Sequence, residues 1–243
     1  MIFRLPTLYK RDTTGKIREW TIEWTGGGVA PAATRTVAGT GTATTSTGLG
    51  LKYTGDNGFA TSLTVNSEGG DDSAGFLTDE DSNKVNLQVA YTQDNYHLSG
   101  TYTTQSNGWD EWHYYSTQTL DQAFDELDGF ALRGWWRPDE TGTIVPSVSI
   151  GYDTMTFSNP QRYTDASGYA VGLNWSDSFQ AGDTIGVAFG QPLKGTDKTS
   201  NAIADDVDPF LWEAYYSFRP NDSIEITPGI FGGSDVHSDT NDD

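Results

Sequence analysis

Apolar and polar residues alternate along most of the chain. Val85, Leu87 and Val89 are apolar, whereas Asn86 and Gln88 between them are polar. A period of two predicts β-strands that have one apolar and one polar face. The same pattern recurs in ten segments, near residues 49–53, 59–65, 85–92, 96–103, 130–137, 144–152, 169–175, 185–189, 210–219 and 224–230. We therefore expect an all-β protein.

Short and long connections alternate between these segments. The short ones are TGDN, QDN, PDETG, SDSFQAGD and PNDS, and the long ones span about 67–83, 106–128, 158–167 and 193–209. A transmembrane barrel has this layout, with short turns at one end and long loops at the other, whereas a Greek-key sandwich does not need it. The expected fold is an antiparallel up-and-down transmembrane β-barrel, or a partial barrel, of about ten strands.

Two prolines argue against uninterrupted strands. Pro146 and Pro228 each follow an isoleucine by two residues within an expected strand. Proline has no N–H group to donate to a β-ladder. We therefore expect both at bulges or strand ends.

The polar face of such a sheet would line a water-filled lumen if the apolar face meets lipid. The residues expected to line the pore are Asn86, Gln88, Thr92, His97, Thr101, Arg133, Arg137, Glu213 and Arg219. Opposed arginine and glutamate side chains inside a lumen can set its charge selectivity. The alternative is that the same residues face solvent on an open sheet.

Aromatic residues gather at the ends of the expected strands, beside the short turns. The residues expected to face lipid or to form an aromatic girdle are Tyr91, Tyr96, Trp136, Trp175, Phe210, Trp212, Tyr216 and Phe218. Such girdles lie at the membrane interfaces of transmembrane barrels. The general preference of aromatic residues for strands is the competing explanation.

Composition divides the chain into four parts. Residues 1–24 form a basic, hairpin-like segment with five of the 14 lysines and arginines, and residues 25–44 are a Gly/Ala/Thr-rich linker or loop. Residues 45–233 are the expected barrel region. Residues 234–243 form an acidic tail that we expect to be disordered.

Charge and motifs exclude several functions. The net charge of −20 argues against a nucleic-acid partner, because binding phosphates requires clustered lysine and arginine. Cysteine is absent, which removes disulfides and thiolate chemistry. No nucleophile-elbow motif occurs, GTGTATTSTGLG lacks the P-loop lysine, and the three histidines lack metal-ligand spacing. We expect neither an enzyme nor a cofactor or zinc site.

Acidic clusters occupy the expected long loops. They are Glu68 with Asp71 and Asp72, Asp79 with Glu80 and Asp81, and Asp205 with Asp206 and Asp208. Because Ca²⁺ prefers oxygen ligands, a loop-bound Ca²⁺ is one interpretation, although none of the clusters has EF-hand spacing. Cation enrichment at a pore mouth and simple solvation of the loops are the others.

Three stretches share a design in which an aromatic residue ends a strand and a short turn follows: GFALRGWWRPDETGTIVPSVSIGYD, YAVGLNWSDSFQAGDTIGVAFGQP and WEAYYSFRPNDSIEITPGIF. Through them, residues 84–233 resemble the cyanobacterial outer-membrane porins, relatives of the carbohydrate-selective porins that are also labelled iron-uptake porins. The resemblance implies an outer-membrane barrel through which small hydrophilic solutes and ions diffuse. The expected partners are membrane lipid and those solutes, with a homo-oligomer such as a trimer as one option.

The chain also departs from that family. Its members have more strands, begin with a signal peptide and end in a strand that closes on an aromatic residue. Here Pro6 and Lys10 interrupt any signal-peptide core, and the chain ends GGSDVHSDTNDD. The sequence therefore resembles an internal portion of such a porin, or a gene truncated at both ends.

The first 24 residues resemble a different family. LPTLYKRDTTGKIREWTIEW is similar to the start of phage-type ATP-dependent DNA ligases, but their Lys-x-Asp-Gly motif is absent. No ligase activity is therefore carried over. Besides the porin hypothesis, two others stay open: a soluble β-sandwich or adhesin-like module that binds glycans through Trp109, Trp112 and Tyr114, and an inactive fragment derived from a nucleotidyltransferase.

Overall fold

The computed structural model describes residues 7–11, 17–22, 47–67, 75–107, 124–161, 163–200 and 208–234. These residues form strands and no helix, so none of them belongs to a helix able to cross a membrane. The strands are β1 (Thr7–Arg11), β2 (Ile17–Ile22), β3 (Thr47–Thr54), β4 (Phe59–Ser67), β5 (Asn83–Thr92), β6 (Tyr96–Ser106), β7 (Glu126–Trp136), β8 (Ser147–Ser158), β9 (Tyr163–Ser176), β10 (Thr184–Lys198), β11 (Phe210–Asn221), β12 (Ile224–Ile226) and β13 (Gly229–Ser234). The predicted all-β class is confirmed.

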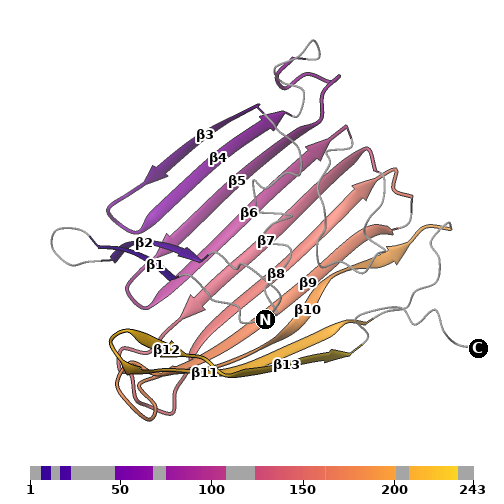
Figure 1. Ribbon diagram of the computed structural model, residues 1–243. Coiled ribbons are helices and arrows are strands. Elements are labelled where there is room, and N and C mark those ends of the chain that lie inside the picture. Colours follow the sequence, from indigo (N-terminus) through magenta and orange to yellow (C-terminus); the bar gives the residue numbers. More distant parts are fainter. Residues whose placement is uncertain are drawn as a thin grey trace, which may run out of the picture.

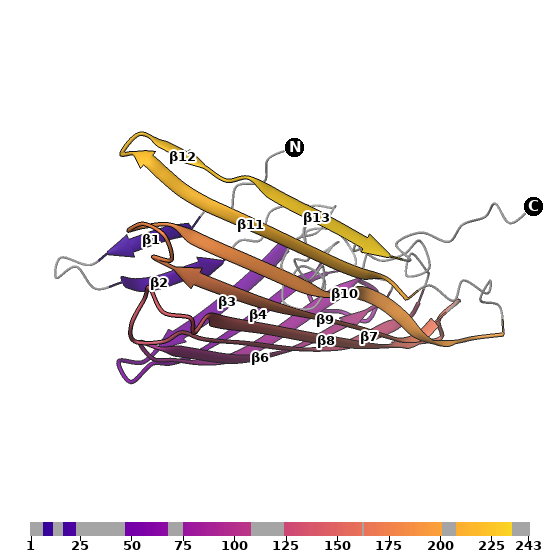
Figure 2. The ribbon, with the colours of Figure 1, turned by 90° about the horizontal axis from the view of Figure 1, so that it is seen from below.

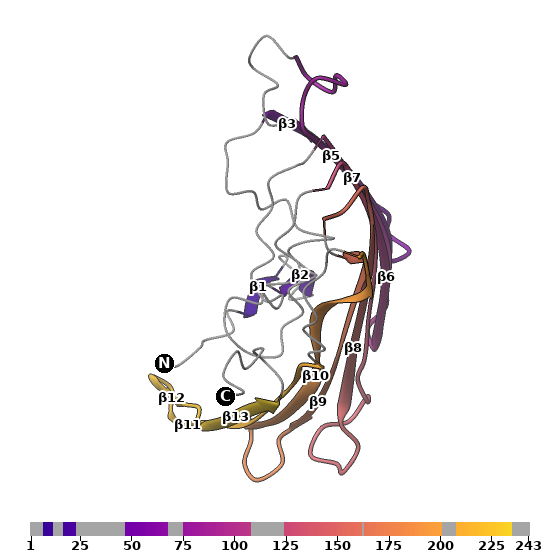
Figure 3. The ribbon, with the colours of Figure 1, turned by 90° about the vertical axis from the view of Figure 1, so that its right-hand side faces the viewer.

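Eleven strands form one antiparallel sheet. From β3 to β11, each strand pairs with its neighbours in the chain, and β12 and β13 pair with different parts of β11 (Figures 1 and 2). The sheet curves without closing, because β3 lies at one end of the arc and β12 and β13 at the other (Figure 3). The up-and-down order is confirmed, and the described strands form a partial barrel. β1 and β2 pair separately as a two-stranded sheet.

Both prolines lie between strands. Pro146 precedes β8, and Pro228 separates β12 from β13. The carbonyl of Pro228 accepts a 3.0 Å hydrogen bond from the backbone N–H of Tyr216. The segment predicted to be a single last strand is therefore two short strands, because proline has no N–H to continue the ladder.

One predicted loop is mostly strand. The sequence predicts a long connection over 158–167, but β8 and β9 continue into it and pair as far as Thr156↔Asp165. β8 ends at Ser158 and β9 begins at Tyr163. The predicted strict alternation of short and long connections is thus wrong here. Polar strand ends carry no apolar alternation, although their backbone groups still pair.

The exposed face of the sheet is the apolar one. On β6, Leu98 and Tyr102 have 58% and 46% of their surface exposed, whereas Ser99, Thr101 and Thr103 are buried. The cross-strand register carries this division to the neighbouring strands. We call the side that includes Leu98 the apolar face and the side that includes Thr101 the polar face. A half-solvated sheet of a soluble protein normally has the opposite arrangement, with its apolar face against a core.

A compact group of buried apolar residues lies at one end of the polar face. We call it the core cluster, and its members are Leu127, Ala131, Met155, Phe157, Tyr163, Ala166 and Leu193. Phe124 packs against it, with its ring centroid 5.2 Å from that of Phe157. Leu127 was predicted to lie in a long loop, but it belongs to β7. The cluster joins β7, β8, β9 and β10 near the connections opposite the short turns.

Candidate pore-lining face and lipid-facing band

Aromatic side chains form two rows on the apolar face. The row beside the short turns contains Tyr91, Tyr96, Trp136, Trp175, Tyr216 and Phe218. The second row contains Tyr102, Phe130, Tyr169 and Trp212, each 40–46% exposed. On β6, β7, β9 and β11 the rows are six residues apart, or about 20 Å at about 3.3 Å per residue.

Exposed aliphatic residues fill the space between the two rows. Leu98 and Leu132 lie there, and Ile150 lies on the same level of β8. We call this zone the apolar band. Its height is close to the roughly 25 Å of the lipid-facing zone in transmembrane barrels.

The polarity of the two faces reverses beyond the second row. There, the residues that continue the apolar face are polar: Thr104, Asp128, Thr154, Thr156, Asp165 and Ser167. The Tyr102 hydroxyl donates to Asp128 (2.6 Å), and the Thr156 hydroxyl donates to Asp165 (3.0 Å). On the opposite face of the same segments lies the core cluster. We call this zone the loop-side extension.

All eight residues predicted to face lipid lie on the apolar face. Tyr91 and Tyr96 lie close together, with ring centroids 6.0 Å apart, and Tyr216 and Phe218 are stacked at 5.2 Å. Phe210 and Trp212 lie at the far end of β11, away from the short turns. The sequence analysis recognised the row beside the turns and, of the second row, named only Trp212, because Tyr102, Phe130 and Tyr169 are not adjacent to turn sequences.

Most of the predicted pore-lining residues share the polar face. Asn86, Gln88 and Thr92 on β5 pair in register with Thr103, Thr101 and His97 on β6. The Gln88 amide donates to the Thr101 hydroxyl (3.2 Å), and the Thr92 hydroxyl lies 2.7 Å from His97 Nδ1. Asn86 also donates to Thr64 on β4 (3.1 Å). Hydrogen bonds between neighbouring strands thus connect these side chains across the polar face.

Arg133 on β7 is held by a carboxylate that the sequence analysis did not single out. Its Nη2 donates to both oxygens of Asp153 on β8, at 2.7 and 2.8 Å. Asp153 is fully buried, and the Arg133 side chain lies beside Gly151. Asp153 lies just beyond the segment predicted as a strand (144–152), and its pairing with Arg133 depends on the register between β7 and β8.

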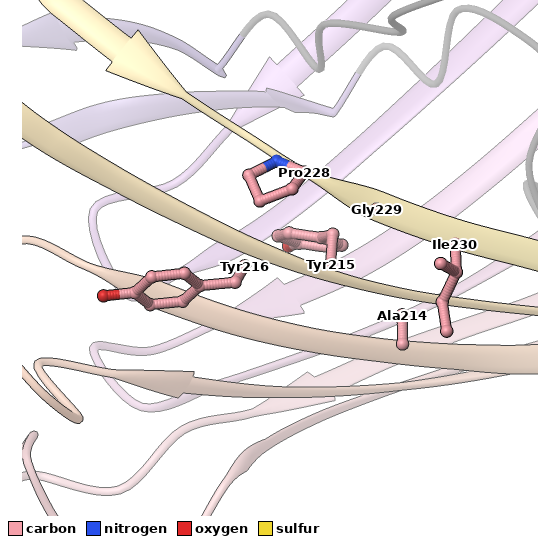
Figure 4. A pocket seen from close by; sticks show the side chains of 6 residues that line it. All are labelled: Ala214, Tyr215, Tyr216, Pro228, Gly229 and Ile230. Carbon is pink, nitrogen blue, oxygen red and sulfur yellow. The ribbon is translucent and has the colours of Figure 1, made fainter.

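Glu213 also lies on the polar face, on β11, next to an aromatic residue of the same face. The Tyr215 hydroxyl donates to Asn174 on β9 (2.9 Å), and the ring lies across Gly186 on β10. A Cβ atom at position 186 would be 2.1 Å from the ring, so only glycine fits beneath it. Figure 4 shows Tyr215 and Tyr216 on β11 beside Pro228, Gly229 and Ile230, where they line a hollow at the sheet edge.

Two arginines among the predicted pore residues lie at the turn end of the sheet. Arg137 follows β7, donates to the carbonyl of Asp94 (2.8 Å) and has its guanidinium carbon 5.6 Å from the Trp135 ring centroid. Arg219 is exposed and pairs with Glu225 at 2.8 Å. Arg137 and Arg219 therefore lie beside the short turns, as do Thr92 and His97, while the other five predicted residues lie farther along the strands.

Carboxylates close the turn at 177–183. Asp183 accepts hydrogen bonds from the backbone N–H groups of Ser178 (2.7 Å), Phe179 (3.0 Å) and Gln180 (3.1 Å) and from the Tyr216 hydroxyl (3.0 Å). Desolvation of Asp183 opposes ionisation, but these donors outweigh it and lower the pKa of its carboxyl group. The N–H of Gly182 donates to Asp177 (2.6 Å) and lowers the pKa of that group.

Several predicted sites lie partly or wholly outside the described residues. These are the glycan-binding aromatics Trp109, Trp112 and Tyr114 and the acidic residues Glu68, Asp71, Asp72, Asp205 and Asp206. Asp79, Glu80 and Asp81 are described, and within the described part of the chain no three histidine or acidic side chains gather into a metal-binding group. The interpretation of these loops as Ca²⁺ sites gains no support from that part.

No protein-family model matches the chain, and a search of curated proteins found no significant match. The porin and ligase resemblances therefore remain predictions from the sequence. The geometry of the sheet is the basis for the function proposed below.

Proposed function

We propose that this chain is an outer-membrane porin, or a part of one, through which small hydrophilic solutes and ions diffuse passively. The observation that carries the proposal is the apolar band, where the exposed face is apolar and the hidden face is polar. Lipid is the surrounding medium that stabilises exposed Leu98, Leu132 and Ile150, and a water-filled lumen is the medium that suits Asn86, Gln88 and Thr101.

The two aromatic rows support the same proposal. Aromatic rings with one polar end favour membrane interfaces, and the rows bound the band on both sides. Beyond the second row, Asp128 and Asp165 make the outer surface polar again. A charge that faces hydrocarbon is costly, so these residues support placing the second boundary of the apolar band at that row. The backbone hydrogen bonds also support the proposal. Interior strands of a sheet pair their N–H and C=O groups with neighbouring strands and leave none exposed to lipid.

The soluble-sandwich alternative gains no comparable support. A sandwich buries its apolar face against a second sheet. Among the described residues the only other sheet is the β1–β2 pair, and the apolar band is exposed. We therefore place the porin proposal first.

The lumen of the proposed porin carries charge of both signs. Arg133 and Asp153 neutralise each other, whereas Glu213 forms no ion pair with any described residue. In the proposed lumen, Glu213 is thus a fixed negative charge that permeating ions meet. Removing it is expected to weaken any preference for cations.

Adjacent residues on β11 provide the test. The chain has no cysteine, so Glu213→Cys on the polar face and Ala214→Cys on the apolar face each introduce a single thiol. After refolding into lipid vesicles, a charged thiol reagent should label Glu213→Cys and alter its conductance in a planar bilayer, while Ala214→Cys should react only with a lipid-soluble maleimide. Equal labelling by the charged reagent, or a protein that stays monomeric and soluble without detergent, would exclude the proposal.

A further inference from the structure

The curved sheet has two open edges. β3 pairs only with β4, and at the other edge β12 and β13 pair only with β11 among the described residues. All eight residues of β3 are exposed, and Leu49, Leu51 and Tyr53 are 60–65% exposed, more than most residues of the apolar band. Open edges present unpaired N–H and C=O groups that bind other strands, and in lipid each such group costs several kcal/mol.

The two edges complement each other. β3 runs toward the short turns and β13 runs away from them, so the two strands would be antiparallel if they met. Both also follow the same division of faces, since Leu49 and Leu51 belong to the apolar face and so does Ile230. Counted from the short turns, Ile230 and Leu49–Leu51 lie at similar depth. Pairing them would continue the apolar band without a break.

Within one copy, the described residues do not bring these edges together. β3 and β13 lie at opposite ends of an open arc whose ends turn toward the same side (Figure 3). A second copy, turned by half a revolution, presents its β13 edge to the first copy's β3 and its β3 to the first copy's β13. Such a cyclic pair leaves no edge open, as a closed oligomer requires.

We propose that two copies of this chain pair edge to edge, β3 of each with the β12–β13 edge of the other, and enclose one shared lumen. The inference rests on the proposed function for two reasons. Lipid makes open edges costly, and the polar face becomes a lumen only when it is enclosed. Neither copy encloses it alone, so each copy contributes half of the lining.

The absence of native cysteine makes cross-linking a direct test. Leu49→Cys, Leu51→Cys and Tyr53→Cys place a thiol on β3, and Ile230→Cys and Ser234→Cys place one on β13. Each β3 variant is refolded in lipid with each β13 variant, oxidised, and analysed by non-reducing electrophoresis. Ile150→Cys, exposed on the apolar face of β8 in the middle of the sheet, is the matched control.

The proposal predicts a disulfide-linked dimer in at least one mixture of a β3 variant with a β13 variant, and none with either variant alone or with the control. A double variant that forms an internal disulfide as a monomer would overturn it in favour of closure within one copy. Dimers from a β3 variant alone would overturn it in favour of β3–β3 pairing. Absence of every cross-link, with a monomeric mass in detergent, would also overturn it.

Conductance separates the failure of this inference from that of the proposed function. A cross-linked dimer that inserts into bilayers without conducting would remove the porin function and leave the edge pairing intact. Channels formed by a chain that remains monomeric would do the reverse. The two proposals therefore fail by different measurements.

Discussion

The apolar band and the loop-side extension are continuous parts of the same strands, yet they are built for different surroundings. In the band, Leu132 of β7 is exposed and Arg133 points to the polar face. Four residues earlier on the same strand, Asp128 is exposed and Leu127 is buried. The backbone pairing does not change between them. If the proposed function holds, lipid meets the band and water meets the extension, and this difference accounts for the change in where apolar residues stand along one strand.

The two ends of the sheet are also stabilised differently. The core cluster packs the loop-side extension, whereas the turn at 177–183 is held by hydrogen bonds to Asp177 and Asp183. The hydrophobic effect therefore stabilises the loop-side extension, and charge-assisted hydrogen bonds stabilise this turn.

The largest effect should come from emptying the core cluster. Leu127→Ala removes a fully buried side chain and is expected to lower the free energy of unfolding by about 2–5 kcal/mol. Leu132→Ala in the apolar band is the matched variant on the same strand, and it should cost much less because that side chain leaves no cavity. Urea unfolding in lipid vesicles measures both. A similar cost for the two would contradict the difference between the regions.

A charge placed on the outer surface should distinguish the band from the extension. Ile150→Lys puts an ammonium group in the band and is expected to cost about 2–4 kcal/mol in a bilayer. Thr154→Lys places the same group four residues further along β8, in the loop-side extension, and should cost no more than about 1 kcal/mol. Unfolding titrations of both variants in vesicles provide the measurement. If Thr154→Lys costs as much, the second boundary is misplaced.

A methyl group should be tolerated on one face and not on the other. Gly186→Ala pushes a Cβ into the Tyr215 ring and is expected to destabilise by about 1–3 kcal/mol. Gly100→Ala on the apolar face meets only ordinary contacts, with atoms of Phe130 and Leu132 at 3.7–3.8 Å, and should be neutral or stabilising. The two unfolding midpoints test this difference.

The smallest effect should be confined to the turn end and should depend on pH. Asp183→Asn keeps the shape of the side chain and loses its charge, so its unfolding midpoint should fall modestly at neutral pH. The folded pKa of Asp183 is lowered below 3.8, so the stabilisation is present above that value and is lost as the pH falls through the folded pKa. The difference between wild type and variant should therefore disappear in acid. A difference that persists there would mean that the carboxylate charge is not the cause.

The sequence predicted this fold well wherever the apolar alternation was strong. The strands around Val85–Tyr91 and Phe130–Trp136 were located correctly, and so was their parity. The extension of β8 and β9 was missed because Thr154, Thr156 and Asp165 interrupt the apolar pattern. Their role emerges only when cross-strand pairing shows that they lie on the outer face of a strand.

The candidate site shows the same limit. Arg133 was recognisable as a charge within a strand, but its partner Asp153 could be identified only from the register between β7 and β8. The place of Tyr215 across Gly186 likewise depends on which residues of β10 and β11 stand opposite each other. Single-strand patterns contain no register, so such pairs were out of reach.

The sequence by itself determined which residues share a face, because side chains alternate strictly along an extended backbone. Proline and the turn residues also marked the strand ends beside the short turns, whereas the ends of β7, β8 and β9 on the opposite side followed only from cross-strand pairing. Only the tertiary structure decided which face is hidden, since curvature and the packing of neighbouring strands bury one side. The tertiary structure alone also placed the reversal of polarity beyond the second aromatic row and left β3 and β13 apart as open edges, because both depend on residues that meet only across strands.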